Sequence, residues 1–268
     1  MDKRDEGRPG VIYDRARGSA IQTISGRLFY PRDPRASEVA VSDYVYSTSL
    51  LCRYNGHTLR FYAVLEHLVR AADLYLRQAG VDDYRSPVLL HHKHRARVAL
   101  RVLRHDLHEG VVGDMTSPMK GCVPSFKAVE DPVEHAFAES FGDERYQADA
   151  AEVKAADLAI AAVERRDLMQ GDEGAHQWPG LPAPSPDYSI PNDDPTYALL
   201  ALIDAVDGPG GEGLANVDGC TAARIASMAR RALALRPETW RTEWNARHAA
   251  LQRAATPRPT ASTCAGEI

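Results

Sequence analysis

Apolar positions along the chain recur at helical spacing and give almost no sign of strands. Within residues 62–78 five of them form one stripe at spacings of three and four, namely Leu65, Leu68, Val69, Ala72 and Leu76. This periodicity is typical of an amphipathic helix with one buried face. The same reasoning predicts further helices from Ser42 and over 94–111, 127–141, 148–169, 196–206 and 220–237. We therefore expect an all-α fold, with only a short extended segment around 21–30.

Changes in composition divide the chain into five parts. Residues 1–20 are polar and rich in Gly and Arg, which favours a flexible arm. Residues 21–170 carry most of the helical patterns and form the main domain. The Pro-rich stretch 171–196 reads as a loop or linker. Residues 197–252 then predict a C-terminal helical extension, and 253–268 a disordered tail.

The overall composition excludes several classes of protein. The chain has 268 residues, 44% hydrophobic and 26% charged, with a net charge of -5, whereas binders of nucleic acid or anionic membranes carry a basic excess. The four cysteines are far apart and form no CxxC pair, which argues against a thiolate zinc site and a disulfide framework. The charged N-terminus has no apolar core of a signal peptide, and the apolar run 197–206 is too short to span a bilayer. We expect a cytoplasmic protein.

One short stretch, "RHDLHEGVVGDMTSPMK" at 104–120, is dense in acids and histidines. On a helix, His105 and Glu109 would share a face, and Asp106 lies three residues before Glu109. The stretch is either an exposed helix end or one wall of a metal site, depending on whether other segments supply ligands.

Two other helices offer those ligands. His67 lies beside the apolar stripe of 62–78, and Asp157 lies within the Ala- and Leu-rich helix of 148–169, where a carboxylate needs a partner. Helical bundles build metal sites from such inward-facing side chains. Two imidazoles and two carboxylates suit one divalent ion, which we expect to be Mn, Co, Mg, Zn, Fe or Ni.

The order His67, then His105-Asp106, then Asp157 resembles the H…HD…D signature of the HD-domain phosphohydrolases. The three blocks "RYNGHTLRFYAVLEH", "LRHDLHEGVVGDMTSPMK" and "VKAADLAIAAVERRDLM" are similar to those of the bacterial and phage HD-domain 5'-deoxynucleotidases. That group includes small phage deoxynucleoside-triphosphate triphosphohydrolases. The resemblance covers roughly residues 20–170 and implies an HD-domain helical bundle followed by a helical extension.

The resemblance also implies roles for individual residues. Those that would ligate the metal are His67, His105, Asp106 and Asp157. Glu109 matches the acid that orients or deprotonates the attacking water, and Asp114 matches a residue that supports catalysis and contacts the sugar.

Substrate-binding positions follow from the same match. Arg53 and Lys120 correspond to phosphate-binding positions, and His57 is a candidate on the phosphate side. Arg suits this role because its guanidinium offers a bidentate fork to phosphate oxygens. Tyr54 falls where related deoxynucleotidases place a Trp against the sugar.

Departures from the family pattern affect specificity and ligation. Tyr54 in place of Trp leaves the selectivity for 2'-deoxy sugars open, and Leu68 stands where the family often has Ser. Arg104 occupies a usually apolar position, from which it either reaches the substrate or faces water. His108, three residues after His105, is a competing ligand.

Two further clusters have simpler explanations. The "HHKH" tract at 91–94 precedes a helix and is expected to be solvated rather than metal-binding. The basic amphipathic segment 229–244 is expected to be a packed helix with a charged outer face.

Together these observations predict metal-dependent hydrolysis of (deoxy)nucleotides at the 5'-phosphate, giving nucleoside and phosphate from a monophosphate. The alternatives are a dNTP triphosphohydrolase that releases tripolyphosphate and a non-catalytic nucleotide-binding HD protein. The resemblance also implies a homo-oligomer, a dimer or higher.

Overall fold

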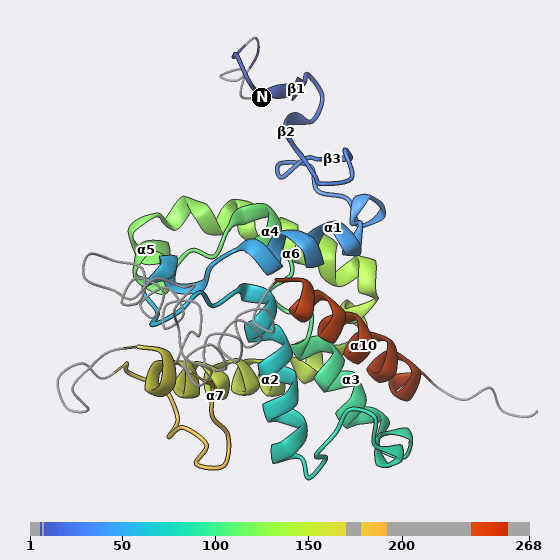
Figure 1. Cartoon of the computed structure of the whole chain (residues 1–268). Helices are drawn as coiled ribbons and strands as arrows, with labels where there is room; N and C mark the ends of the chain where they lie inside the picture. Colours follow the sequence, from blue (N-terminus) through green and yellow to red (C-terminus); the bar gives the residue numbers. More distant parts are fainter. Residues whose placement is uncertain (1–5, 7, 170–177, 192–236, 257–268) are drawn as a thin grey trace, which may run out of the picture.

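The computed structural model describes residues 6, 8–169, 178–191 and 237–256, and within them the chain forms a helical bundle (Figure 1). The α-helices of these residues are α1 (Val41–Leu50), α2 (Val64–Gln78), α3 (Lys93–Val102), α4 (Glu109–Val112), α5 (Ser117–Cys122), α6 (Lys127–Phe141), α7 (Ala150–Leu168) and α10 (Pro237–Ala255). Short 3-10 helices accompany them: η1 (Ala36–Glu38), η2 (Arg53–Gly56), η3 (Pro87–Leu90), η4 (Pro124–Phe126) and η5 (Asp143–Asp149). The predicted all-α class is confirmed, apart from one small sheet.

Helix α2 lies at the centre of the bundle, in contact with α1, α3, α7 and α10. The whole predicted apolar stripe of this helix is buried, because neighbouring helices cover it from several sides. Burying a Leu or Val side chain contributes about 1.5–3 kcal/mol, so this stripe anchors the core. The side chain of His67, near the start of α2, is fully buried in the same interior.

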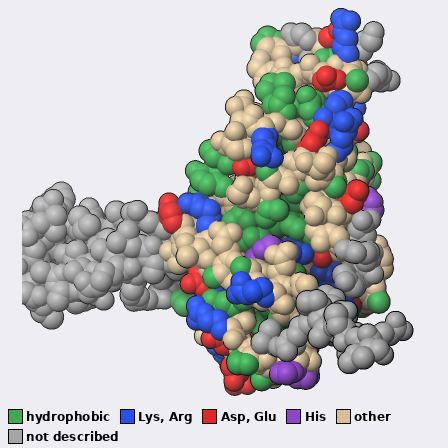
Figure 2. All heavy atoms as spheres, turned by 90° about the vertical axis from the view of Figure 1, so that its right-hand side faces the viewer, with side chains coloured by type: hydrophobic (Ala, Val, Ile, Leu, Met, Phe, Trp, Pro, Cys, Tyr) green, Lys and Arg blue, Asp and Glu red, His purple; other side chains and the backbone are tan. Residues whose placement is uncertain are grey.

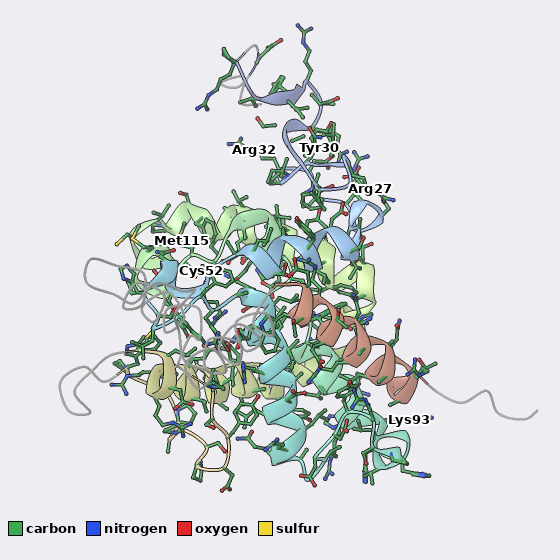
Figure 3. All side chains as sticks on the ribbon, in the orientation of Figure 1. Arg27, Tyr30, Arg32, Cys52, Lys93 and Met115 are labelled. Atoms are coloured by element: carbon green, nitrogen blue, oxygen red, sulfur yellow. The ribbon has the colours of Figure 1, made fainter. Side chains whose placement is uncertain are left out.

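A three-stranded antiparallel sheet stands beyond the helical body at the N-terminal end of the described chain (Figure 1). Its strands are β1 (Ile12–Asp14), β2 (Gly18–Gln22) and β3 (Leu28–Phe29). Arg17, in the β1–β2 turn, pairs with Asp33 at 2.5 Å and Glu38 at 2.6 Å, and its guanidinium lies over the ring of Tyr30. Tyr30 and its neighbours Arg27 and Arg32 are labelled in Figure 3. Part of the predicted flexible arm of residues 1–20 thus contributes strands β1 and β2, and the residues that pair with Arg17 lie 16 and 21 positions later.

The predicted helix 94–111 is interrupted. Helix α3 ends at Val102, residues 103–108 form successive turns, and α4 begins at Glu109. Backbone bonds in the turns span three residues, such as Leu107 N to Arg104 O at 3.0 Å. On a regular α-helix, the side chains of adjacent residues point about 100° apart. The turns of residues 103–108 are tighter than an α-helix, so the adjacent residues His105 and Asp106 need not keep this angle.

The remaining predicted boundaries are partly tested. Residues 178–191 contain no helix or strand, as expected of a loop, but they are bound to the bundle rather than free. The helices predicted over 196–206 and 220–237 lie outside the described residues, except for Pro237. Helix α10 covers the end of the predicted extension and continues to Ala255, so the predicted tail, 253–268, begins too early.

Helix α10 packs against α1, α2 and α3. The buried indole of Trp244 donates from Nε1 to the carbonyl oxygen of Leu103 at 2.8 Å. The ring of His248 stacks on Trp244 at 4.5 Å between centroids, and its Nε2 accepts from Arg104 at 2.8 Å. Leu103 and Arg104 directly precede His105 and Asp106. Through its contacts with these two residues, α10 holds the turn of residues 103–108 in place.

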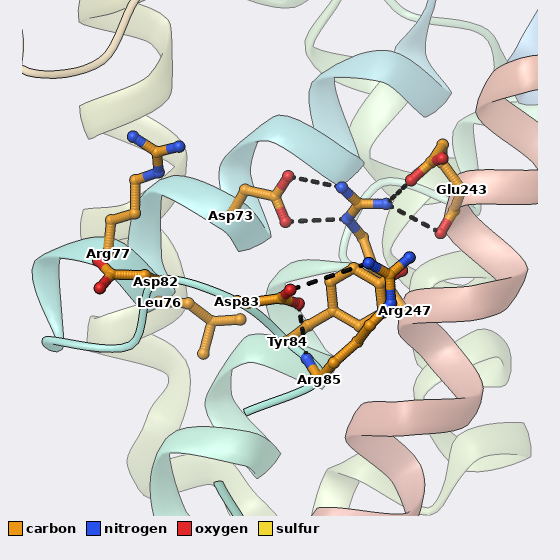
Figure 4. A pocket seen from close by; sticks show the side chains of 9 residues that line it. All are labelled: Asp73, Leu76, Arg77, Asp82, Asp83, Tyr84, Arg85, Glu243 and Arg247. Carbon is orange, nitrogen blue, oxygen red and sulfur yellow. Dashed lines mark hydrogen bonds and ion pairs between the residues drawn. The ribbon is translucent and has the colours of Figure 1, made fainter. Parts of the chain in front are cut away.

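A polar cavity of about 320 Å³ lies where the end of α2 faces α10 (Figure 4). At its edge the guanidinium of Arg247 is paired with Asp73 at 2.8 Å and with Glu243. This pairing joins α10 to α2 by a charge-assisted contact in addition to its apolar packing.

The surface of the described residues carries mixed charge. On the face shown in Figure 2, basic and acidic side chains are interspersed around small apolar areas. Among the helices of the described residues, none combines the length and the apolar character that crossing a lipid bilayer requires.

The buried contact of His248 predicts a loss of stability in mild acid. Burial, and then the charge of Arg104, lower the pKa of this imidazole from 6.5 to about 4. Because the unfolded chain takes up the proton first, stability is present above pH 6.5 and falls as the pH is lowered toward about 4. One pKa unit corresponds to about 1.4 kcal/mol, and partial exposure reduces the effect, so we expect about 1–2 kcal/mol.

Urea unfolding at several pH values measures this effect. The His248→Gln protein keeps an acceptor for Arg104 but does not titrate, so its stability should depend less on pH than that of the wild type between pH 6.5 and 4. The exposed His91→Gln variant is the control and should follow the wild type. An identical pH profile in His248→Gln and wild type would contradict the prediction.

Candidate metal centre

The structure brings the four predicted ligands together from three segments: α2, the turn after α3, and α7. One ligand atom from each of His67, His105, Asp106 and Asp157 lies within 4.8 Å of all the others. The two Nε2 atoms are 3.4 Å apart, His105 Nε2 is 3.2 Å from Asp106 Oδ2, and His67 Nε2 is 3.6 Å from Asp157 Oδ1. Ligands about 2.1 Å from one ion lie about 3 to 4.2 Å apart. This cluster could therefore hold a metal ion.

The second nitrogen of each histidine is bound in a way that suits metal ligation. Nδ1 of His67 donates to Glu164 Oε1 at 2.6 Å, and Nδ1 of His105 donates to the carbonyl oxygen of Val102 at 2.7 Å. With the proton held on Nδ1, the Nε2 lone pair of each ring faces the cluster. Metal-binding histidines are oriented by such partners.

The electrostatics of the cluster favour a positive charge at its centre. Burial lowers the pKa of the His105 imidazole, but Asp106 and Asp157 more than compensate and raise it well above its usual range. The two carboxylates thus stabilise a proton on His105. A divalent cation would compete for the same position, because metal binding releases protons from its ligands.

Glu164 is a site residue that sequence reasoning missed. Its fully buried carboxylate accepts from His67 Nδ1, from Tyr62 Oη at 2.8 Å and from Tyr54 Oη. Burial would raise the pKa of Glu164, but its neighbours His67 and Arg53 and the hydrogen bonds that it accepts lower it to about 2. Glu164 follows Asp157 by seven residues, two helical turns, and this same-face spacing was the available signal.

Arg53 and Glu109 adjoin the cluster and are both buried. Nη1 of Arg53 donates to Asp106 Oδ2 at 3.3 Å, while Arg53 Nε and Glu109 Oε2 are buried without a hydrogen-bond partner. Burial, then the carboxylates of Asp106 and Asp114, raise the pKa of Glu109 well above its usual value. Arg53 Nε lies 3.7 Å from Glu164 Oε2, beyond hydrogen-bond distance but within range of an ion pair. Buried polar atoms are nearly always hydrogen-bonded, so Glu109 Oε2 suits a water molecule, an ion or a substrate.

Asp114 acts on the backbone of the turn that carries Arg53 and Tyr54. Its Oδ2 accepts from the backbone N of Tyr54 at 3.1 Å. Tyr54 and Asn55 have positive φ angles of 54° and 52°, a strained conformation for residues other than Gly. Cys52 directly precedes Arg53, and Met115 directly follows Asp114. Both labelled residues lie on the same side of the molecule in Figure 3. Asp114 thus stabilises the conformation of this turn.

The other predicted substrate residues lie in different surroundings. Nζ of Lys120, on α5, pairs with Glu130 Oε1 at 2.7 Å, so Lys120 must leave or share that partner to reach a phosphate. His57 is exposed at the end of η2. His108 donates from Nδ1 to the carbonyl oxygen of His105 at 3.0 Å and does not belong to the four-residue cluster.

The structure also gives the surroundings of Arg104 and of the "HHKH" tract. Arg104 neither faces water nor approaches the cluster: it is buried between Asp143, at 3.2 Å, and His248. In the "HHKH" tract, His94 is half exposed and lies 3.2 Å from Glu152.

Fold and site together define a helical protein with a buried His/Asp cluster able to hold a metal ion. No protein-family model matches the sequence. The chain is 30% identical over 168 residues to the uncharacterized protein YfdR of Escherichia coli (strain K12). The aligned region covers 62% of this chain and 82% of YfdR. It belongs to the same family as YfdR. The chain is also 29% identical over 103 residues to the uncharacterized protein RCAP_rcc00048 of Rhodobacter capsulatus. This alignment covers 37% of the chain and 46% of that protein.

Proposed function

We propose that this chain is an HD-type, metal-dependent phosphohydrolase that removes the 5'-phosphate of (deoxy)nucleoside monophosphates. The supporting observation is the convergence of two imidazoles and two carboxylates from α2, the 103–108 turn and α7, with the buried Arg53 and Glu109 beside them. A pure nucleotide-binding protein has little use for a buried, unpaired carboxyl group at this place.

The residues divide the work of the reaction. His67, His105, Asp106 and Asp157 would hold one divalent ion of the Mn, Co, Mg, Zn, Fe or Ni class, which would supply positive charge and lower the pKa of water bound to it. The guanidinium of Arg53, which lies 3.3 Å from Asp106 Oδ2, binds a phosphate oxygen. Glu109 orients the attacking water and takes its proton. The new P–O bond forms from water, the P–O5' bond breaks, and O5' gains the proton that Glu109 releases, which gives the nucleoside and orthophosphate.

Other residues hold this machinery in place. Glu164 fixes the ring of His67, and Asp114 fixes the backbone at Tyr54. Lys120, paired with Glu130 in this structure, adds a second cation for the phosphate by moving between the two anions. The predicted cytoplasmic location and homo-oligomeric state belong to the same proposal, and light scattering tests the latter.

Product analysis tests the proposed reaction. The purified protein is incubated with Mn²⁺, Co²⁺, Mg²⁺ or Zn²⁺ and with ribo- and deoxynucleoside mono- and triphosphates, and the products are separated by chromatography. We expect nucleoside and orthophosphate from monophosphates. Tripolyphosphate from triphosphates would instead establish the triphosphohydrolase alternative. Nucleotide binding without any product would overturn the proposal in favour of a binding protein.

A further inference from the structure

Beside the cluster, an aromatic residue from outside the HD-like region meets Tyr54. The rings of Trp178 and Tyr54 are 5.6 Å apart between centroids and tilted by 59°. The Trp178 side chain is 37% exposed. Part of the indole is therefore open to a ligand, and an aromatic ring offers a large apolar contact area.

The segment that carries Trp178 is fixed to the bundle. Arg166 on α7 donates to the carbonyl oxygens of Ser185 at 2.8 Å and Tyr188 at 2.6 Å, and Asp167 accepts from Ile190 N at 2.7 Å. The segment 178–191 runs beside α7 in Figure 1. These bonds attach residues 185–190 to the helix that also carries Asp157, and the contact with Tyr54 places Trp178 beside the turn that precedes α2.

Tyr54 connects Trp178 to the cluster. Its hydroxyl donates to Glu164, whose other oxygen accepts from His67 Nδ1, and its neighbour Arg53 contacts Asp106. The aromatic pair therefore borders the place where a phosphate would bind. A phosphate ester held by Arg53 would extend its organic part toward this aromatic border.

We propose that Trp178 is the wall on which the base of the nucleotide stacks, an inference that rests on the proposed function. Aromatic side chains recognise bases through their π-faces, which every base has, and this recognition tolerates changes of base. Trp178 therefore determines selectivity for nucleotides over sugar phosphates without choosing a particular base. Purines, which have the larger ring area, should bind more tightly than pyrimidines.

Kinetics of two substrates separate base stacking from phosphate chemistry. For a deoxynucleoside monophosphate, Trp178→Ala should raise KM about 5- to 50-fold and change kcat little, and Trp178→Phe should restore most of the loss. For deoxyribose 5-phosphate, which has no base, KM should stay the same. Val88→Ala, an exposed apolar substitution on η3, is the control and should change neither KM.

A second measurement does not depend on activity. Binding of a purine nucleotide should quench the tryptophan fluorescence of the wild-type protein, and the quenching should be largely lost in Trp178→Phe, which keeps Trp240 and Trp244. Unchanged quenching in this variant, or an equal change of KM for both substrates, would overturn the role of Trp178. Absence of hydrolysis of either substrate by the wild type would refute the proposed function, while the fluorescence result would still decide on stacking.

Discussion

An Asp106→Ala protein is expected to fold normally, to lose its bound divalent ion and to release phosphate at least about 100-fold more slowly. Asp106 is the ligand closest to His105, at 3.2 Å, and it also binds Arg53, so its removal affects both the ion and the phosphate. Removing this carboxylate relieves its repulsion with Asp157 but also removes its attraction to His105 and Arg53; the fold should survive because Arg53 keeps the carboxylate of Glu164 at 3.7 Å. Metal content by mass spectrometry, metal titration by calorimetry and phosphate release measure the effect.

Two variants bracket this result. Glu164→Gln removes a charge that touches His67 but leaves all four ligands, and such changes around a metal cost about 10- to 100-fold in affinity or activity. Asp131→Ala removes an exposed carboxylate paired with Lys127, and it should behave as the wild type. Full metal binding and activity in Asp106→Ala would show that the cluster is not the metal centre.

The Glu109→Gln protein is expected to keep its metal and its fold but to lose about 10²- to 10⁴-fold in kcat, the usual contribution of a general base or acid. In the metal-free protein, its stability should increase at neutral pH. Because burial and neighbouring carboxylates raise the pKa of Glu109 in the folded protein, the folded form holds the proton more tightly than the unfolded form. The wild type therefore loses stability as the pH rises above about 4.5, and a neutral Gln removes that loss.

Thermal melts at pH 5 and pH 7, together with single-turnover kinetics, test both parts of this prediction. The matched control is Glu134→Gln, an exposed position on α6, for which neither kcat nor the melting temperature should change. A Glu109→Gln protein with normal kcat would remove Glu109 from the chemistry. Reduced stability at pH 7 would mean that its carboxylate has a stabilising partner.

Local patterns predicted the helices that pack through one continuous stripe. The five stripe positions of α2 and the bounds of α6 follow from spacing alone, because apolar residues recur in each successive turn of the helix. The ligand set followed from the resemblance, since nothing local relates His67 to Asp157. The structure places both within one cluster.

Other features depend on contacts between distant residues. The break after Val102 has no Gly or Pro to mark it, and it is maintained partly by the bond from Trp244 to Leu103. The N-terminal sheet depends on the ion pairs of Arg17. The spacing of Glu164 from Asp157 places both on one face of α7, but the contact of Glu164 with His67 appears only in the structure. Sequence periodicity describes one element at a time and does not contain these pairings.

The support of the 103–108 turn by α10 has a consequence for the newly made protein. Leu103 and its partner Trp244 are separated by 141 positions, and a ribosome adds residues at about 5–20 per second. A nascent chain that has just exposed its His-Asp pair thus waits on the order of ten seconds for the helix that holds it. The cluster that could hold a metal ion is therefore completed late, and we expect any ion to be acquired after translation ends.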